Sequence, residues 1–83
     1  MFKARVYITL KPTVMDAQGA VVQKALHNLG YPTVEGLRIG RYLELSLNGS
    51  DRSAAERALT EMCRKLLANP IIENFRFELE AVK

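Results

Sequence analysis

The first ten residues alternate between apolar and polar side chains. The even positions Phe2, Ala4, Val6, Ile8 and Leu10 are apolar, whereas Lys3, Arg5, Tyr7 and Thr9 lie between them. A period of two places all the apolar side chains on one face of an extended chain. The pattern therefore predicts a strand over residues 2–10 with one buried face.

A helical pattern follows this strand. Asp16 is a suitable N-cap, and the apolar residues Val22, Ala25, Leu26 and Leu29 recur every three or four positions. Gly30 and then Pro32 end the pattern.

The middle of the chain keeps one apolar phase across Gly40-Arg41. The odd-numbered residues that share this phase are Leu37, Ile39, Leu43, Leu45 and Leu47. A two-residue hairpin at Gly40 would break this phase, whereas a three-residue turn or a long strand bent at Gly40 would keep it, and the long bent strand is favoured. Because such a strand is longer than a small sheet can pair, we expect part of it to pair with a second copy of the chain.

The last third of the chain predicts a second helix and a final strand. Asp51 or Ser53 can cap the helix, and Asn69, in a left-handed conformation, with Pro70 can end it. Its apolar stripe contains Ala55, Ala58, Leu59, Met62, Cys63, Leu66 and Leu67. Beyond it, Phe75, Phe77 and Leu79 alternate with charged residues, which is typical of a strand.

These elements predict an α+β two-layer sandwich that forms one domain over residues 1–83. Its antiparallel sheet has two helices on one face, in the order β-α-β-α-β with a long second strand bent at Gly40. The other face is expected to be polar and to carry Lys3, Arg5, Tyr7, Tyr42, Glu44, Arg76, Glu78 and Glu80.

Composition indicates an ordinary globular protein of the cytoplasm. The formal net charge is +3, and 48% of the 83 residues are hydrophobic. No apolar run reaches the roughly 18 residues of a membrane span, and the alternating N-terminus does not resemble a signal peptide. Cys63, the single cysteine, is consistent with a reducing compartment.

The sequence offers no catalytic residue and no metal site of its own. His27, the single histidine, is predicted on the outward side of the first helix, and Cys63 lies within the apolar stripe of the second. A nucleophile needs an adjacent base, and a buried thiol stays protonated. The dispersed glycines match neither a P-loop nor a dinucleotide fingerprint.

RNA binding is the main alternative function. Tyr7 and Tyr42 on an open sheet face, with Arg5 and Arg38, would suit single-strand stacking. Acidic residues on the same face and scattered basic residues weigh against it. Tyrosines on an open sheet are more often subunit contacts.

The corner from Lys11 to Gly19 has a local interpretation as a strand end followed by a helix cap. Together with other segments it resembles the PurS family, the small subunit of bacterial phosphoribosylformylglycinamidine (FGAM) synthase. The segments that carry this resemblance are Lys11-Pro12, Asp16 with Gln18-Gly19, Ala25 to Gly30, Arg38 to Arg41, Glu44 and Cys63 to Glu73. The family commonly has proline at Ala17, lysine at Arg41 and glycine at Thr13.

The resemblance implies a noncatalytic subunit in purine biosynthesis. The complex would use ATP and glutamine to convert formylglycinamide ribonucleotide (FGAR) to FGAM, and this chain would support assembly and ammonia transfer. The implied partners are the large synthetase subunit (PurL), which would hold ATP and Mg²⁺, the glutaminase subunit (PurQ), and further copies in a homodimer or tetramer. No cofactor, nucleic acid or membrane is expected on this chain. Contact or positioning roles are expected for Lys11, Asp16, Gln18, Arg41 and Asn69.

Overall fold

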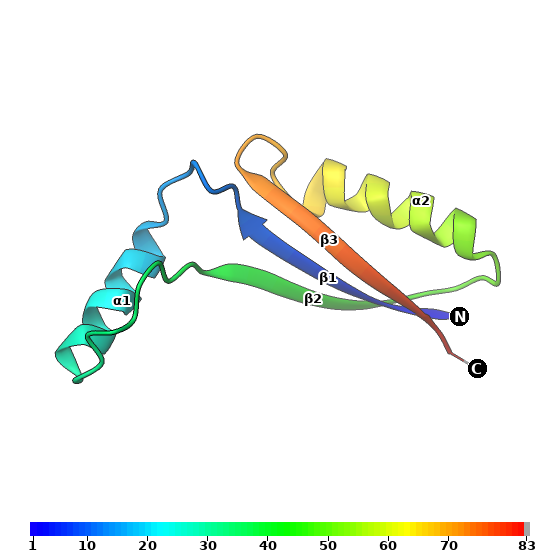
Figure 1. Ribbon diagram of the computed structural model, residues 1–83. Helices are drawn as coiled ribbons and strands as arrows, with labels where there is room; N and C mark the ends of the chain where they lie inside the picture. Colours follow the sequence, from blue (N-terminus) through cyan, green and yellow to red (C-terminus); the bar gives the residue numbers. More distant parts are fainter. Residues whose placement is uncertain (83) are drawn as a thin grey trace.

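The computed structural model describes residues 1–82 and contains one three-stranded antiparallel sheet with strand order β2-β1-β3 (Figure 1). The elements in chain order are β1 (Phe2–Leu10), α1 (Ala17–Asn28), β2 (Gly40–Leu47), α2 (Arg52–Met62), a π-helical turn η1 (Cys63–Leu67) and β3 (Glu73–Ala81). The predicted α+β class and the order β-α-β-α-β are confirmed.

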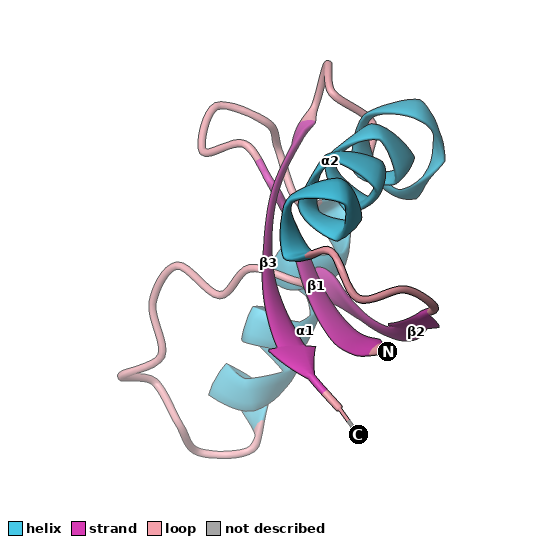
Figure 2. Cartoon of the chain, turned by 90° about the vertical axis from the view of Figure 1, so that its right-hand side faces the viewer, coloured by secondary structure: helices cyan, strands magenta, loops and turns pink. Residues whose placement is uncertain are grey.

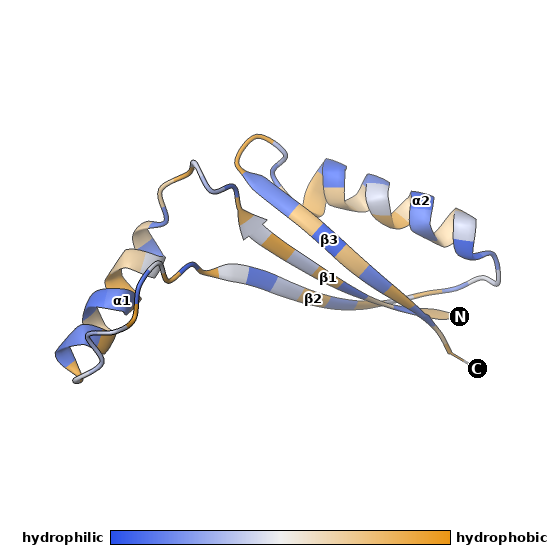
Figure 3. Cartoon of the chain, in the orientation of Figure 1, coloured by the Kyte–Doolittle hydropathy of each residue, from blue (hydrophilic) through white to orange (hydrophobic). Residues whose placement is uncertain are grey.

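The core lies between one face of the sheet and α2. Val6 of the central strand is opposite Leu43 of β2 and Phe77 of β3, so the apolar residues of all three strands share a face. Leu59 and Cys63 are completely buried against this face. Figure 2 shows α2 lying along that side of the sheet, and Figure 3 shows the apolar positions alternating along the strands.

The first helix does not cover the sheet. Two helices on one face were expected, but α1 extends away beyond the end of β1 and the start of β2 (Figure 1). The described chain is correspondingly elongated, with extents of 50 × 29 × 14 Å and a radius of gyration of 16.4 Å. A compact chain of this length would have a radius of gyration of about 12 Å. The amphipathic pattern correctly predicted a helix here, but such a pattern does not indicate on which surface the helix packs.

The second strand is shorter than expected, because it begins at Gly40. Before it, the Leu37 N–H donates to the Gln23 side chain and the Ile39 N–H donates to Asp16, so neither amide faces another strand. A Cβ at Gly40 would lie 2.5 Å from the Ile8 carbonyl oxygen. The glycine therefore permits a close approach of β2 to β1, and the strand starts at Gly40 where a bend within a longer strand was predicted.

A side-chain cap defines the start of the second helix, and a backbone hydrogen bond defines its end. Asp51, rather than Ser53, is the N-cap, and it accepts from the Ser53 N–H at 3.0 Å. At the other end the Ala68 N–H donates to the Cys63 carbonyl across η1. Asn69 does not adopt the left-handed conformation that we expected. Its side-chain oxygen instead accepts from the Ile71 N–H at 3.1 Å.

We predict that Leu59→Ala lowers the free energy of unfolding by about 3 kcal/mol, because it leaves a cavity between α2 and the sheet. Urea denaturation at one fixed protein concentration measures the change. Arg57→Ala, on the exposed side of the same helix, is the control and should change stability by less than about 0.5 kcal/mol. Equal effects of the two variants would contradict this description of the core.

Candidate functional site

The Asp16 carboxylate joins the start of α1 to the segment that returns toward the sheet. One oxygen accepts from the Gly19 N–H at 2.8 Å, and the other accepts from the Ile39 N–H at 2.6 Å. The residue is buried, with 9% of its surface exposed. These backbone donors, first Ile39 and then Gly19, hold the pKa of Asp16 below its ordinary value. Asp16 is thus a helix cap and also a cross-link between two segments.

Gly19 makes this cross-link possible. A Cβ on it would lie 2.6 Å from the Leu37 carbonyl oxygen and 2.7 Å from an Asp16 carboxylate oxygen. Two further contacts join α1 to the returning segment: Gln23 with the Leu37 N–H at 3.1 Å and His27 Nε2 with the Val34 oxygen at 2.8 Å. Residues 12–39 therefore form one internally bonded unit, which we call the arm.

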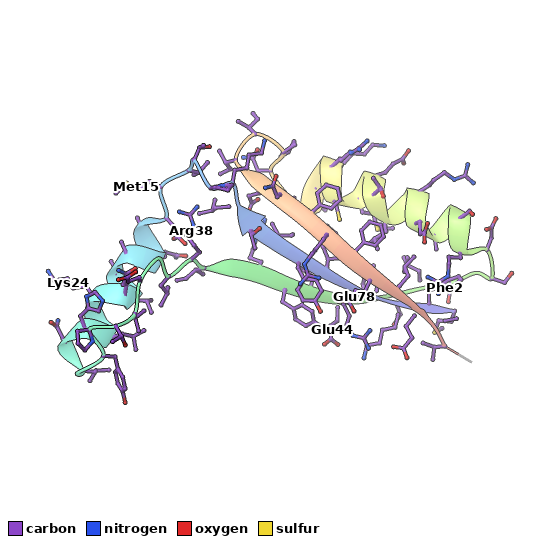
Figure 4. All side chains as sticks on the ribbon, in the orientation of Figure 1. Phe2, Met15, Lys24, Arg38, Glu44 and Glu78 are labelled. Carbon is purple, nitrogen blue, oxygen red and sulfur yellow. The ribbon has the colours of Figure 1, made fainter. Side chains whose placement is uncertain are left out.

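Arg38 joins the two chain segments at the base of the arm. Its guanidinium donates to the carbonyl oxygens of Lys11 at 3.0 Å and Val14 at 2.8 Å. Figure 4 shows Arg38 between α1 and the end of the sheet, with Met15 nearby on the connecting segment. The sequence placed Arg38 in the segment of family resemblance and as a residue for RNA contact, because no local pattern indicates that its partners lie more than twenty residues earlier.

A second cluster connects β2, η1 and β3. Arg41 donates to both carboxylate oxygens of Glu73, at 2.8 and 3.0 Å, and to the Leu67 carbonyl oxygen at 2.8 Å. The Asn69 N–H donates to Glu73 at 2.7 Å. The Asn69 amide first, and Arg41 next, lower the pKa of Glu73. We call Arg41, Leu67, Asn69 and Glu73 the clamp.

The five residues singled out from the sequence fall into two groups. The clamp brings Arg41 and Asn69 together through Glu73, which the sequence indicated only as part of the segment that resembles the family. Lys11 lies beside the clamp, where its N–H donates to the Ile72 oxygen at 2.8 Å and its side chain shares a hollow with Glu73. Asp16 and Gln18 lie in the arm, with Asp16 buried and Gln18 exposed.

The open face of the sheet is polar and its charges are paired. Its ion pairs are Arg5–Glu80 at 2.9 Å, Lys3–Glu44 at 3.7 Å and Arg76–Glu78 at 3.6 Å. Tyr7 lies between Tyr42, at a ring distance of 5.1 Å, and the Arg76 guanidinium, 3.9 Å from its ring centre. Glu44 and Glu78 project on the side opposite α2 in Figure 4. The charged and aromatic side chains named here thus have their partners on the same face of the sheet.

The reactive side chains occupy structural positions. Cys63 is buried, and desolvation raises the pKa of its thiol, which favours the unreactive protonated form. His27 lies on the arm and contacts a backbone oxygen. Within residues 1–82 no group of three His, Cys, Asp or Glu residues is arranged to hold a metal ion. None of the described helices is long and apolar enough to cross a membrane.

We predict that Asp16→Asn lowers the melting temperature by several degrees at pH 7. The two bonds use different carboxylate oxygens, so an amide would place its NH₂ group, which is a donor, against one of the two backbone N–H groups. The pKa of Asp16 is lowered by folding, so its contribution is present above the ordinary carboxyl value of about 4 and is lost as pH falls through the folded value. The difference between variant and parent should therefore shrink in acid, as thermal scans from pH 7 to pH 3 would show.

The matched control for this prediction is Asp51→Asn, because Asp51 caps α2 without a bond to a distant segment. Asparagine remains a good N-cap, so this variant should melt close to the parent. If the two variants melt alike, the cross-link from Asp16 to Ile39 contributes no stability.

Comparison with known proteins gives one family for nearly the whole chain. The sequence model described as PurS, phosphoribosylformylglycinamidine (FGAM) synthase, matches residues 3–81. The PurS subunit of Bacillus subtilis is 49% identical over 99% of this chain and 96% of its own length. The Methanocaldococcus jannaschii subunit is 32% identical over the full length of both chains.

Solved structures agree with this assignment. Bacillus subtilis PurS superposes with a TM-score of 0.89 at 48% identity, covering 98% of this chain and all of the other. A chain of the Thermotoga maritima PurLQS structure has a TM-score of 0.86 at 23% identity, over 95% of this chain and 96% of the other, which supports the fold. Sequence and fold together place the chain in the PurS family of FGAM synthase subunits.

Proposed function

We propose that this chain is the small, noncatalytic subunit of a phosphoribosylformylglycinamidine synthase, a ligase of purine biosynthesis. It supports the assembly of a synthetase subunit with a glutaminase subunit and the transfer of ammonia between them. The observation that carries the proposal is the family match over residues 3–81. The Thermotoga maritima relative, in the structure named PurLQS, gives the kind of complex in which such a chain works.

The geometry of the chain suits an assembly role. The arm extends away from the sheet, and the clamp fixes the neighbouring end of the sheet through the Arg41–Glu73 pair. The thiol and the imidazole are held in structural contacts, as described above. The chain therefore contributes surfaces for binding, and the catalytic residues belong to its partners.

The proposal assigns the reaction components to those partners. ATP, Mg²⁺ and FGAR bind to the large synthetase subunit, and the glutaminase subunit releases ammonia with its own cysteine. This assignment rests on the family resemblance. We place the complex in the cytoplasm, where a buried and reduced Cys63 is chemically stable.

The contact surface that we propose for these partners is the end of the sheet that carries Lys11, the clamp and the base of the arm. Lys11 and Gln18 act there as contact residues. Asp16, Arg41 and Asn69 act as positioning residues, because their bonds hold the segments on which the surface is built. Half of the Arg41 side chain is exposed, so it can also face a partner.

RNA binding, the alternative function, is disfavoured because the basic side chains of the open face already form ion pairs. Lys3, Arg5 and Arg76 each have a carboxylate partner, so a phosphate would have to compete with an existing ion pair. Arg76 also covers one side of the Tyr7 ring, which would occupy a stacking position for a base.

We predict that glutamine-dependent FGAM formation requires this chain. The synthetase and glutaminase subunits of the same organism are combined with and without it, and FGAM is measured with either glutamine or ammonium as the nitrogen source. Adding the chain should raise the glutamine-dependent rate at least tenfold and change the ammonium-dependent rate much less. An unchanged glutamine-dependent rate, together with salt-sensitive RNA binding, would contradict the proposal.

We predict that Lys11→Glu weakens binding to the larger subunits by about tenfold, which corresponds to about 1.4 kcal/mol. The Lys11 backbone bonds remain in the variant, so the melting temperature of the isolated chain should stay close to that of the parent. Binding is measured by calorimetry. Lys24→Glu on the outer part of α1 is the charge-matched control and should bind normally, whereas equal weakening by both variants would remove Lys11 from the proposed surface.

A further inference from the structure

The third strand has a free edge. In the order β2-β1-β3, β3 pairs with β1 on one side only. Beyond the two ends of this ladder, the Lys11 N–H donates to the Ile72 oxygen at 2.8 Å. The Val82 N–H likewise donates to the Met1 oxygen at 2.8 Å. Both pairs continue the register of the ladder, so even-numbered residues of β3 direct their N–H and C=O groups toward β1 and odd-numbered residues direct theirs outward.

The outward backbone groups in the middle of β3 are unpaired. Near the ends of the strand, the Glu73 N–H donates into the preceding turn at 2.7 Å, and the Leu79 oxygen accepts from Arg52 at 3.2 Å. Between them, the N–H and C=O groups of Phe75 and Phe77 have no hydrogen-bond partner within residues 1–82. β3 contains no proline, so this part of the edge can pair with a further extended segment.

The helix flank beside this edge is basic. The hollow between the helix and β3 is lined by residues that include Phe77 of the sheet and Glu56, Arg57 and Arg64 of the helix. The two arginines are exposed and lie about two helical turns apart on one side. Neither forms an ion pair within the described residues. Glu61, also in the lining, pairs with a lysine at 3.7 Å, so Glu56 is left to oppose two arginines.

A second hollow continues the first toward the end of the sheet. Its lining includes Lys11, Arg64, Glu73 and Phe75, so Arg64 borders both hollows. Glu73 is already bonded to Arg41 at 2.8 and 3.0 Å, and only 14% of its side chain is exposed. Lys11 and Arg64 therefore place positive charge beside Phe75 without a carboxylate to neutralise it.

The unpaired backbone groups and the unpaired positive charges lie together. Phe77 lines the first hollow and Phe75 lines the second, and these are the two residues with free outward groups. A segment paired with them would direct every second side chain to the helix side of the sheet, beside Arg57, Arg64 and Lys11. Carboxylates at those positions would form charge-assisted hydrogen bonds with the three basic side chains.

We propose that the free edge of β3 binds an extended acidic segment of a partner protein, which adds a further strand to the sheet. Backbone hydrogen bonds to Phe75 and Phe77 hold the segment, and two of its acidic side chains, separated by one residue, face the basic helix flank. The proposal rests on the proposed function for the source of the segment, which is one of the larger subunits. It extends the proposed contact surface from the end of the sheet along β3.

The β3 strand of a second copy does not have the required pattern. Its side chains on the helix side are Phe75, Phe77 and Leu79, and pairing two such edges in antiparallel fashion keeps these apolar side chains on that side. Arg57 and Arg64 would then still lack a carboxylate partner. An acidic segment of a different protein satisfies both the backbone groups and the charges.

The test uses the isolated full chain and a short capped peptide in which Glu alternates with Val and Thr. Nuclear magnetic resonance measures the hydrogen exchange of each β3 amide with and without the peptide. We expect saturating peptide to slow the exchange of the Phe75 and Phe77 amides by about tenfold or more. The Arg76 and Glu78 amides, which already face β1, should change little. A peptide with Lys in place of each Glu is the control probe and should protect neither phenylalanine amide.

A charge reversal tests the basic flank. Arg64→Glu should raise the dissociation constant of the Glu peptide by about tenfold, because Arg64 borders both hollows. The same variant should bind the larger subunits more weakly by a similar factor. Lys24→Glu on α1 is the charge-matched control and should bind the peptide like the parent. Circular dichroism checks the helix content, and Arg57→Glu replaces Arg64→Glu if that variant loses helix.

Three results would overturn the proposal. The first is a Glu peptide that leaves the Phe75 and Phe77 amides unprotected, the second is equal binding of the Lys peptide, and the third is an unchanged dissociation constant for Arg64→Glu. Protection of the same amides in the chain alone, growing with its concentration, would assign the edge to a second copy instead. The peptide measurements contain no larger subunit, so these results would leave the proposed function standing. Loss of glutamine-dependent stimulation would likewise leave the peptide binding standing.

Discussion

One apolar face of a three-stranded sheet must be covered, and α2 is the described helix that packs on it. Leu59 and Cys63 fill the centre completely, whereas the inward residues of both edge strands, such as Leu43 and Phe77, stay partly accessible. Burying the remaining apolar area would add stability. The first helix does not supply that cover, because it lies beyond the end of the sheet, and the described chain is elongated.

The Asp16 carboxylate determines how α1 is placed relative to the segment that returns to the sheet. By accepting from Gly19 and Ile39 it fixes α1 to the returning segment, and Arg38 joins the returning segment to the residues that follow β1. Buried polar groups with complete hydrogen bonding favour one arrangement over alternatives. These bonds therefore hold α1 and the returning segment in one arrangement.

The clamp and the open face show how charge is used elsewhere on the chain. Arg41 and Glu73 join the first residues of β2 to the first residues of β3, although β1 lies between these strands. On the open face the charges pair across strands, which keeps that side of the sheet polar and free of large apolar patches.

The sequence by itself determined the elements and the family. Alternation in β1, the stripe of α2 and the Asp16 cap are local patterns, and local patterns depend on neighbours that are close in the chain. Three features became visible only in the tertiary structure. The first helix does not cover the sheet, β2 starts at Gly40, and Glu73 and Arg38 connect the segments of the site. Those outcomes depend on contacts between residues more than twenty positions apart, such as Asp16 with Ile39 and Arg41 with Glu73, which periodicity does not encode.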